Sequence, residues 1–285
     1  MILITGATGH FGSAAIEFLL NKSPSLKIAA LVRDEKKGES LARKGVELRI
    51  GDYFNYSSLA EAFKGIDKLG FVSSSSLEKR VLQHTNVINA AKQAGVKHIY
   101  YTSIVKASAD TKFIPGLDHF KTEEAIKNSG IIYTFLRNTF YMDTLPESLN
   151  IALKRGVWAF PTNGAQSNYA ARIDMAEAFA NVIYAEGHEN KIYEITSDKA
   201  YTYNEIIGIV NKLLGKEIKY ADISFDDLAE GLKKAGTPDP VIKTIASIAE
   251  AISGGELDVV DGSLEKLLQR KPVSLEEFLS KTLAD

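Results

Sequence analysis

The stretch that decides the fold is Ile2-Leu3-Ile4-Thr5-Gly6-Ala7-Thr8-Gly9-His10-Phe11-Gly12. Its first residues form a short apolar run, and glycines recur at every third position after it. A helical pattern of apolar residues then extends from Ala14 to Leu20. A strand that passes through a glycine turn into a helix is typical of a phosphate-binding loop, because the helix N-terminus presents backbone amides to an anion.

The glycines of this loop have different predicted roles. Gly6 permits the tight turn, Gly9 lets a pyrophosphate approach the backbone, and Gly12 lets the helix pack on the sheet. We therefore expect the loop to hold the phosphates of a dinucleotide. The residues expected to contact it are Gly6, Ala7, Thr8, Gly9, His10, Phe11 and Gly12.

The first half of the chain repeats this rhythm of strand and helix. Short β-branched or apolar runs alternate with longer amphipathic stretches, and Gly, Asp, Asn or Ser bounds the runs. Such alternation is typical of repeated βα units, so the sequence predicts an α/β Rossmann fold with a doubly wound parallel sheet. The predicted strands are Ile2–Thr5, Ile28–Val32, Val46–Ile50, Lys68–Val72, His98–Thr102 and Ile131–Leu136.

One of the intervening helices is predicted from Leu82 to Ala94. Apolar residues recur there at helical spacing, and Gly95 stands where a C-terminal cap belongs. The residues that carry the repeat are Leu82, Val87, Ile88 and Ala91.

The rhythm changes beyond about Tyr141, where short strands (157–160 and 192–195) alternate with helices (174–185 and 203–214). We expect a Rossmann domain at residues 1–140 and a smaller, mostly helical substrate-binding lobe at residues 141–285. It is left open whether core elements of the first domain are shared with residues 157–196. Two helices of the lobe begin with predicted capping boxes, formed by Thr202 with Glu205 and by Ser274 with Glu277.

Composition narrows the classes of partner. The formal charge of −2 gives no basic excess for nucleic acid or an anionic membrane, so the expected partner is a small molecule. With no cysteine there is no thiolate metal site, and the five histidines form no metal-ligand pair at short spacing. The N-terminus lacks a signal-peptide pattern, and no apolar run reaches transmembrane length, so we expect a cytoplasmic protein. The oligomeric state stays open.

The second strand ends in Leu31-Val32-Arg33-Asp34, where enzymes of this fold distinguish NAD from NADP. Arg33 can pair with a 2′-phosphate through parallel hydrogen bonds, and Lys36 and Lys37 can add positive charge. NADP(H) is therefore favoured over NAD. The alternatives for Asp34 are a contact with the ribose, neutralisation of Arg33, or a solvated charge at a helix start.

Two further strand ends carry polar residues. Asp52, after the third strand, is expected to accept a hydrogen bond from the adenine amine, with a helix cap or turn as the alternative. Ser73, Ser74 and Ser75, in the run that ends at Ser76 after the fourth strand, are expected to meet the cofactor ribose, although such a run is also typical of an ordinary loop.

Five segments together resemble one known family. They are GATGHFG (6–12), LVRD (31–34), GDY (51–53), QHTNVINAAKQAGVKHIYYTS (83–103) and LRNTFYMD (136–143). The chain resembles the NmrA-like atypical short-chain dehydrogenases over nearly its whole length, and within them the type 2 NAD(P)H:quinone oxidoreductases and triphenylmethane reductases. The resemblance implies an NADPH-dependent reductase with a quinone-like substrate. It also implies cofactor contacts from residues 6–12, Arg33, Ser73 to Ser75, and Ser103.

Most short-chain dehydrogenases carry Tyr-Xaa-Xaa-Xaa-Lys, which supplies a proton to a carbonyl oxygen. None of the twelve tyrosines has a lysine four residues later. Ordinary carbonyl reduction and sugar epimerisation are therefore disfavoured, because alkoxide formation needs that proton. Hydride addition to a quinone gives a delocalised anion that solvent can protonate, and a cationic triarylmethane dye needs no proton.

Four residues are candidates for the catalytic site in place of the missing pair. Ser103, at the end of the fifth strand, is expected to orient the nicotinamide or a substrate oxygen, with a hydrogen bond to its own backbone as the alternative. His119 is a candidate proton donor or a structural histidine. Asn138 and Tyr141 follow the sixth strand and are expected to bracket the quinone, with core or cap roles as the alternative. His84 and His98 are expected to be structural.

A second class of function remains open. Some NmrA-like proteins sense NADP(H) and bind a partner protein without turnover, and the missing Tyr/Lys pair suits them equally well.

Overall fold

The computed structural model describes residues 1–76 and 79–283, and it contains two compact units. Residues 1–104, 118–137 and 175–193 form the first unit, and residues 105–117, 138–174 and 194–285 form the second. The chain therefore passes between the units more than once.

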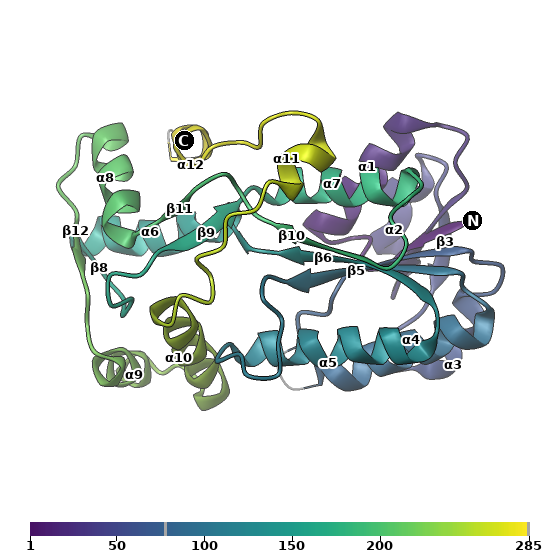
Figure 1. Ribbon diagram of the computed structural model, residues 1–285, viewed down its shortest axis with the longest axis horizontal. Coiled ribbons are helices and arrows are strands. Elements are labelled where there is room, and N and C mark those ends of the chain that lie inside the picture. The colour runs from purple at the N-terminus through teal and green to yellow at the C-terminus, as the bar shows by residue number, and fades with distance from the viewer. Residues whose placement is uncertain (77–78, 284–285) are drawn as a thin grey trace. The chain divides into compact units, whose positions relative to one another are not determined.

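A seven-stranded sheet dominates the first unit (Figure 1). Its order is β10-β6-β5-β4-β1-β2-β3, and the pairs β1–β2, β1–β4, β2–β3 and β4–β5 are parallel. The order reverses between β1 and β4, which is where doubly wound sheets bind ligands. The strands are β1 (Ile2–Ile4), β2 (Ile28–Val32), β3 (Glu47–Ile50), β4 (Lys68–Phe71), β5 (His98–Ile104), β6 (Ile132–Asn138) and β10 (Lys191–Ile195).

Helices cover both faces of this sheet. Figure 1 shows α1 and α7 over one face and α3, α4 and α5 over the other. The predicted α/β Rossmann class and all six strands predicted in the first half are confirmed, and β2 has the predicted bounds. The helices are α1 (His10–Lys22), α2 (Glu35–Ala42), α3 (Tyr56–Ala62), α4 (Arg80–Ala94), α5 (Ile114–Ser129) and α7 (Arg172–Tyr184).

Two helices differ from the sequence expectation. α1 begins at His10 rather than Ala14, so the last glycine of the loop already lies in the first helical turn. α4 ends as predicted, with Gly95 in the left-handed conformation (φ 74°). Leu82, however, is 55% exposed and does not belong to the buried face of α4. Polar side chains, which an apolar pattern cannot reveal, occupy that part of the buried face instead.

The second unit is mostly helical. Its helices are α6 (Leu145–Arg155), α8 (Tyr203–Leu214), α9 (Phe225–Lys234), α10 (Asp239–Ser253), α11 (Ser263–Leu268) and α12 (Leu275–Thr282), with a 3-10 turn, η1 (Met142–Thr144). Its small sheets join β11 (Ala200–Tyr201), β9 (Ser167–Ala170) and β7 (Phe140–Tyr141), and β12 (Lys219–Ala221) with β8 (Val157–Ala159).

The predicted helix caps of this unit are present. Thr202 and Glu205 form the full capping box of α8. At α12, Ser274 Oγ accepts from the Glu277 amide, whereas the Glu277 carboxylate pairs with Lys281. The second box is therefore present in one direction only. Within residues 1–76 and 79–283, no helix combines the length and the hydropathy needed to span a bilayer. The cytoplasmic location expected from the sequence stays a prediction.

Candidate functional site

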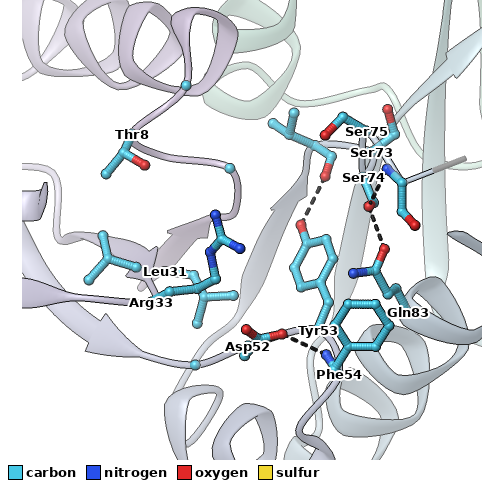
Figure 2. Close-up of a pocket in the computed structure, with 16 residues that line it drawn as sticks. Thr8, Leu31, Arg33, Asp52, Tyr53, Phe54, Ser73, Ser74, Ser75 and Gln83 are labelled. Carbon is cyan, nitrogen blue, oxygen red and sulfur yellow. Dashed lines mark hydrogen bonds between the residues drawn. The ribbon is translucent and has the colours of Figure 1, made fainter. Parts of the chain in front are cut away.

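A pocket of about 480 Å³ opens at the carboxyl ends of β1 to β4 in the first unit (Figure 2). Its walls come from the glycine loop, from the ends of β2 and β3, and from the serine run after β4. The lining residues are Gly6, Thr8, Gly9, Leu31, Val32, Arg33, Gly51, Asp52, Tyr53, Phe54, Val72, Ser73, Ser74, Ser75, Ser76 and Gln83.

The glycine loop is shaped by backbone geometry. Gly6 adopts φ +59°, which L side chains rarely adopt, and turns the chain at the end of β1. A Cβ on Gly12 would lie 2.3 Å from the Gly6 carbonyl oxygen and 3.0 Å from the Ala7 Cα. Gly12 therefore lets α1 pack closely against the loop. From the sequence we expected Gly12 to allow packing on the sheet instead.

Only some of the loop residues that were expected to contact the cofactor line the pocket. They are Gly6, Thr8 and Gly9. Ala7 is fully buried, and the Phe11 ring packs edge-on against Phe179 at 5.4 Å, so these two side chains belong to the core. The His10 side chain is exposed at the start of α1. Any contact that Ala7, Phe11 or Gly12 makes with a phosphate would use the backbone, whereas His10 could also use its exposed side chain.

Arg33 stands at the end of β2, exposed and lining the pocket. Figure 2 shows its guanidinium directed into the space that the glycine loop and Asp52 border. Asp34 caps α2, and its Oδ1 accepts from the Lys36 amide at 2.9 Å. The interpretation of Asp34 as a helix-start charge is thus confirmed. Lys36 and Lys37 are exposed and do not line the pocket.

The segment after β3 contributes one expected residue and two missed ones. Asp52 lines the pocket, and its Oδ1 accepts from the Phe54 amide at 2.8 Å, so the turn given as the alternative role of Asp52 is present. Tyr53 donates to the Val72 carbonyl at 2.9 Å, and burial raises the pKa of its phenol. Phe54 is 53% exposed at the pocket (Figure 2). The sequence signal that could have found Tyr53 and Phe54 is their position directly after Asp52, which was expected at the pocket.

The serine run is held by hydrogen bonds from two elements. Ser73 donates its amide to Thr102 Oγ1 of β5 at 2.9 Å. Ser74 donates its amide to His84 and its hydroxyl to Gln83, both on α4, at 2.9 and 2.5 Å. Ser73, Ser74 and Ser75 all line the pocket as expected. Gln83 was missed, because nothing in the sequence shows that the start of α4 turns toward the run.

Ser103 has a partner that sequence reasoning missed. Its hydroxyl donates to Glu123 Oε1 of α5 at 2.6 Å. The alternative role considered for Ser103, a hydrogen bond to its own backbone, is therefore wrong. Arg137 of β6 donates to both Glu123 oxygens, through Nε at 2.9 Å and a terminal nitrogen at 2.7 Å. Glu123 is fully buried and Ser103 nearly so, and Ser103 does not line the pocket.

His119 lies inside the first unit rather than at the pocket wall. It is 7% exposed, and its Nδ1 lies 2.7 Å from the Tyr101 hydroxyl. Burial, with a smaller contribution from the charge of Arg80, lowers the pKa of His119 well below 6.5. His84 and His98 are buried and hydrogen-bonded, with Nδ1 of His84 2.9 Å from Thr122 and Nε2 of His98 2.8 Å from Thr134, which confirms their structural interpretation.

Asn138 and Tyr141 belong to the second unit. Asn138 is 3% exposed, and its side chain lies beside the Tyr141 phenol, where it lowers the pKa of that phenol against the larger, opposing effect of burial. The Arg172 guanidinium lies 4.8 Å from the centre of the Tyr141 ring, and burial raises the pKa of the Tyr141 phenol.

The sheet order, the glycine loop and the pocket at the strand ends define a dinucleotide-binding Rossmann protein. The NmrA-like family model matches residues 1–279, so the chain belongs to the NmrA-like family. Among curated relatives, quinone oxidoreductase 2 of Escherichia coli strain K12 is 38% identical over 280 residues, which is 98% of either chain.

Solved structures agree over the same length. The crystal structure of the NADPH-dependent quinone oxidoreductase from Escherichia coli in complex with NADPH has a TM-score of 0.95 and 38% identity, covering 99% of this chain and 100% of that one. The triphenylmethane reductase of Citrobacter sp. in complex with NADP(H) has a TM-score of 0.92 and 37% identity, covering 99% of both chains.

Proposed function

We propose that this protein is an NADPH-dependent reductase that transfers hydride to a quinone or a similar conjugated acceptor. The observation that carries the proposal is Arg33 in the same pocket as the glycine loop. A cation at the end of β2 selects a 2′-phosphate, as NADPH has and NADH lacks. The relatives with 37–38% identity, whose structures were solved with NADPH or NADP(H), support the same cofactor.

The residues present fit this cofactor. The pocket volume of about 480 Å³ lies within the usual range for small-molecule sites. Gly12 leaves space where a Cβ would clash with the loop, and the N-terminus of α1, at His10, lies within the loop. We propose that the loop holds the pyrophosphate, Arg33 the 2′-phosphate, Asp52 the adenine amine, and Ser73 and Ser75 the ribose nearest the nicotinamide.

When bound, NADPH supplies a hydride from C4 of its nicotinamide. The protein then orients the two reactants and excludes water. His119 is neutral because burial disfavours its charged form, so it holds no extra proton to give near neutral pH. The Ser103 hydrogen is directed to Glu123. These contacts favour direct transfer followed by protonation of the product from solvent.

The substrate side of the proposal rests on the second unit. The structure assigns residues 175–193, within the range 141–285 expected from the sequence, to the first unit, so we propose that the second unit forms the substrate-binding lobe and that its residues Asn138 and Tyr141 contact the acceptor. The buried amide of Asn138 beside the Tyr141 phenol supports this role, because an amide N–H and a phenol O–H can both donate to a quinone oxygen.

The second candidate is an NADP(H)-sensing regulator without turnover. The absence of a tyrosine and lysine pair, together with the neutral and buried His119, suits that function too. Steady-state oxidation of NADPH and NADH with a set of benzoquinones and a cationic triarylmethane dye tests the choice. A reductase consumes NADPH faster than NADH with at least one acceptor. Binding of NADPH without oxidation by any acceptor would instead identify the regulator.

A further inference from the structure

Three side chains from the first turns of α4 converge on one residue of the pocket wall. Arg80 Nε donates to the Ser74 carbonyl at 2.8 Å, Gln83 Oε1 accepts from the Ser74 hydroxyl at 2.5 Å, and His84 Nε2 accepts from the Ser74 amide at 2.9 Å. These residues have i, i+3 and i+4 spacing, which places them on one face of the helix. We call Arg80, Gln83 and His84 the α4 clamp.

The clamp leaves the Ser74 hydroxyl with no hydrogen to offer a ligand. A serine hydroxyl has one hydrogen, and here it is directed to Gln83. The same oxygen also accepts from the Ser76 amide at 3.1 Å. Ser73 and Ser75 flank it on the pocket wall, and neither hydroxyl has a hydrogen-bond partner in the described part of the chain. The adjacent serines therefore have different capacities: Ser74 fixes the run, and its neighbours can contact a ligand.

The tautomer of His84 follows from the ends of its hydrogen-bond chain. The Ser74 amide can only donate, so His84 Nε2 must accept from it. At the other end, Thr122 Oγ1 donates to the Asp118 carbonyl at 2.7 Å, so it accepts from Nδ1 of His84 at 2.9 Å. Only a neutral imidazole with its hydrogen on Nδ1 satisfies both ends.

The surroundings of the ring keep it neutral and fixed in orientation. Burial, with a smaller contribution from the charge of Arg80, lowers the pKa of His84 to about 3. The ring packs edge-on against Phe71 of β4 and Tyr101 of β5, with centroid distances of 4.8 and 5.7 Å. The acceptor for the Ser74 amide is thus held by the core of the sheet.

We propose that the α4 clamp is a positioning unit for NADPH, in which neutral His84 holds Ser74 so that Ser73 and Ser75 present their hydroxyls to the bound cofactor. This inference rests on the cofactor of the proposed function and does not depend on the identity of the acceptor. His84, Arg80 and Gln83 act through Ser74 and take no part in hydride transfer.

Two substitutions of His84 separate positioning from packing. His84→Phe keeps a planar ring but removes the acceptor, whereas His84→Gln loses the ring and keeps an acceptor at similar reach. Loss of one hydrogen bond near the ligand predicts an NADPH Kd about tenfold higher for His84→Phe. His84→Gln should stay within about threefold of the wild-type Kd. Titration calorimetry of the folded variants gives the binding constants, and thermal unfolding gives their stability.

Thr122→Val provides a variant remote from the pocket. It keeps the shape of the buried Thr122 side chain but removes the acceptor for Nδ1 of His84, so NADPH should bind about threefold to tenfold more weakly. Nitrogen NMR of the wild-type imidazoles should show the His84 hydrogen on Nδ1 and none on Nε2.

Equal NADPH affinity in the wild type and in His84→Phe would overturn the proposal, as would a His84 hydrogen on Nε2. Equal weakening in His84→Phe and His84→Gln, in step with lost stability, would also overturn it, because a purely structural role predicts that pattern. A wild-type protein that binds NADPH but reduces no acceptor would contradict the proposed reductase activity. The NADPH binding constants of the variants would still test the role of the α4 clamp in that case.

Discussion

The Ser103 hydroxyl donates to Glu123 at 2.6 Å, inside an ion pair that Arg137 completes with two hydrogen bonds to the same carboxylate. The single hydrogen of Ser103 is thereby used, so its oxygen can only accept from a ligand. For the contact of Ser103 with the nicotinamide, which stays a prediction, a carboxamide N–H suits such an acceptor, whereas a developing negative charge on a substrate oxygen does not.

We expect this buried ion pair to be important for stability. Glu123→Ala leaves the largely buried guanidinium of Arg137 without this carboxylate, which should lower the free energy of unfolding by about 3–5 kcal/mol. Glu124→Ala is the matched control. Its carboxylate is 44% exposed and pairs with Lys127 on the surface of α5, so we expect a loss of less than about 0.5 kcal/mol. Urea unfolding measures both, and similar losses for the two variants would contradict the interpretation.

Charge reversal at the end of β2 tests the cofactor preference. Arg33→Asp replaces an attractive contact with the 2′-phosphate by a repulsive one, so NADPH should bind more than about tenfold more weakly. NADH has no 2′-phosphate and should be affected far less. Arg43→Asp makes the same change at an exposed site outside the pocket, at the end of α2, and should leave both affinities near wild type. If Arg33→Asp weakened both nucleotides equally, Arg33 would not be the selecting residue.

Gly12 tests the geometry of the glycine loop. The Cβ of Gly12→Ala would lie 2.3 Å from the Gly6 carbonyl oxygen, so the loop must move. We expect about 1–3 kcal/mol of lost stability and at least tenfold weaker NADPH binding. Gly231→Ala is the matched control in α9, where an added Cβ meets nothing within 4 Å. That variant should gain about 0.5–1 kcal/mol, because alanine favours helix. Urea unfolding would show whether the two variants change the free energy of unfolding in opposite directions, and calorimetry would give their affinities for NADPH.

Three buried histidines, His84, His98 and His119, predict that the fold weakens in mild acid, since burial lowers the pKa of each. Burial lowers the pKa of His84 to about 3 and that of His98 to about 4, from an ordinary value of 6.5. Below pH 6.5 the unfolded chain binds protons that the folded chain does not bind. The contribution of these histidines to the free energy of unfolding is therefore complete above pH 6.5, and it falls as the pH drops toward 4. Urea unfolding at a series of pH values should give a shallower dependence for His84→Gln than for the wild type. Parallel curves for the two proteins would show that His84 is not held neutral by the fold.

Much of the first unit could be predicted from the sequence because its pattern is local. Apolar runs bounded by turn residues placed the strands, and the glycine loop after β1 indicated the position of the pocket, which Gly6, Thr8 and Gly9 line. Arg33 and Asp52 could be found because the fold fixes the strand ends at which they stand. Helix starts were less certain: α1 extends back to His10, since the amides of a first turn need no apolar pattern.

The parts that could not be predicted depend on contacts between distant segments. Glu123 meets Ser103 across 20 residues of chain, and His84 joins Ser74 to Thr122. The sequence indicated a structural role for His84 and site roles for Ser74 and Ser103, but it could not show which distant side chains they contact. The short strands β7, β9 and β11 were missed because their tertiary partners, rather than their own sequence, stabilise them.

In the proposed reaction, hydride passes directly from NADPH to an acceptor on this protein, without an acid from a side chain. This mechanism is tested most directly by single-turnover oxidation of protein-bound NADPH by a benzoquinone, with hydride or deuteride at C4, in wild type, His119→Ala and Tyr141→Phe. We predict that deuteride slows oxidation in all three proteins and that each variant keeps at least about a tenth of the wild-type rate. A required proton donor contributes about 10²–10⁴-fold. A loss of that size in His119→Ala or Tyr141→Phe, with NADPH binding intact, would contradict the claim, as would NADPH that stays reduced on wild type.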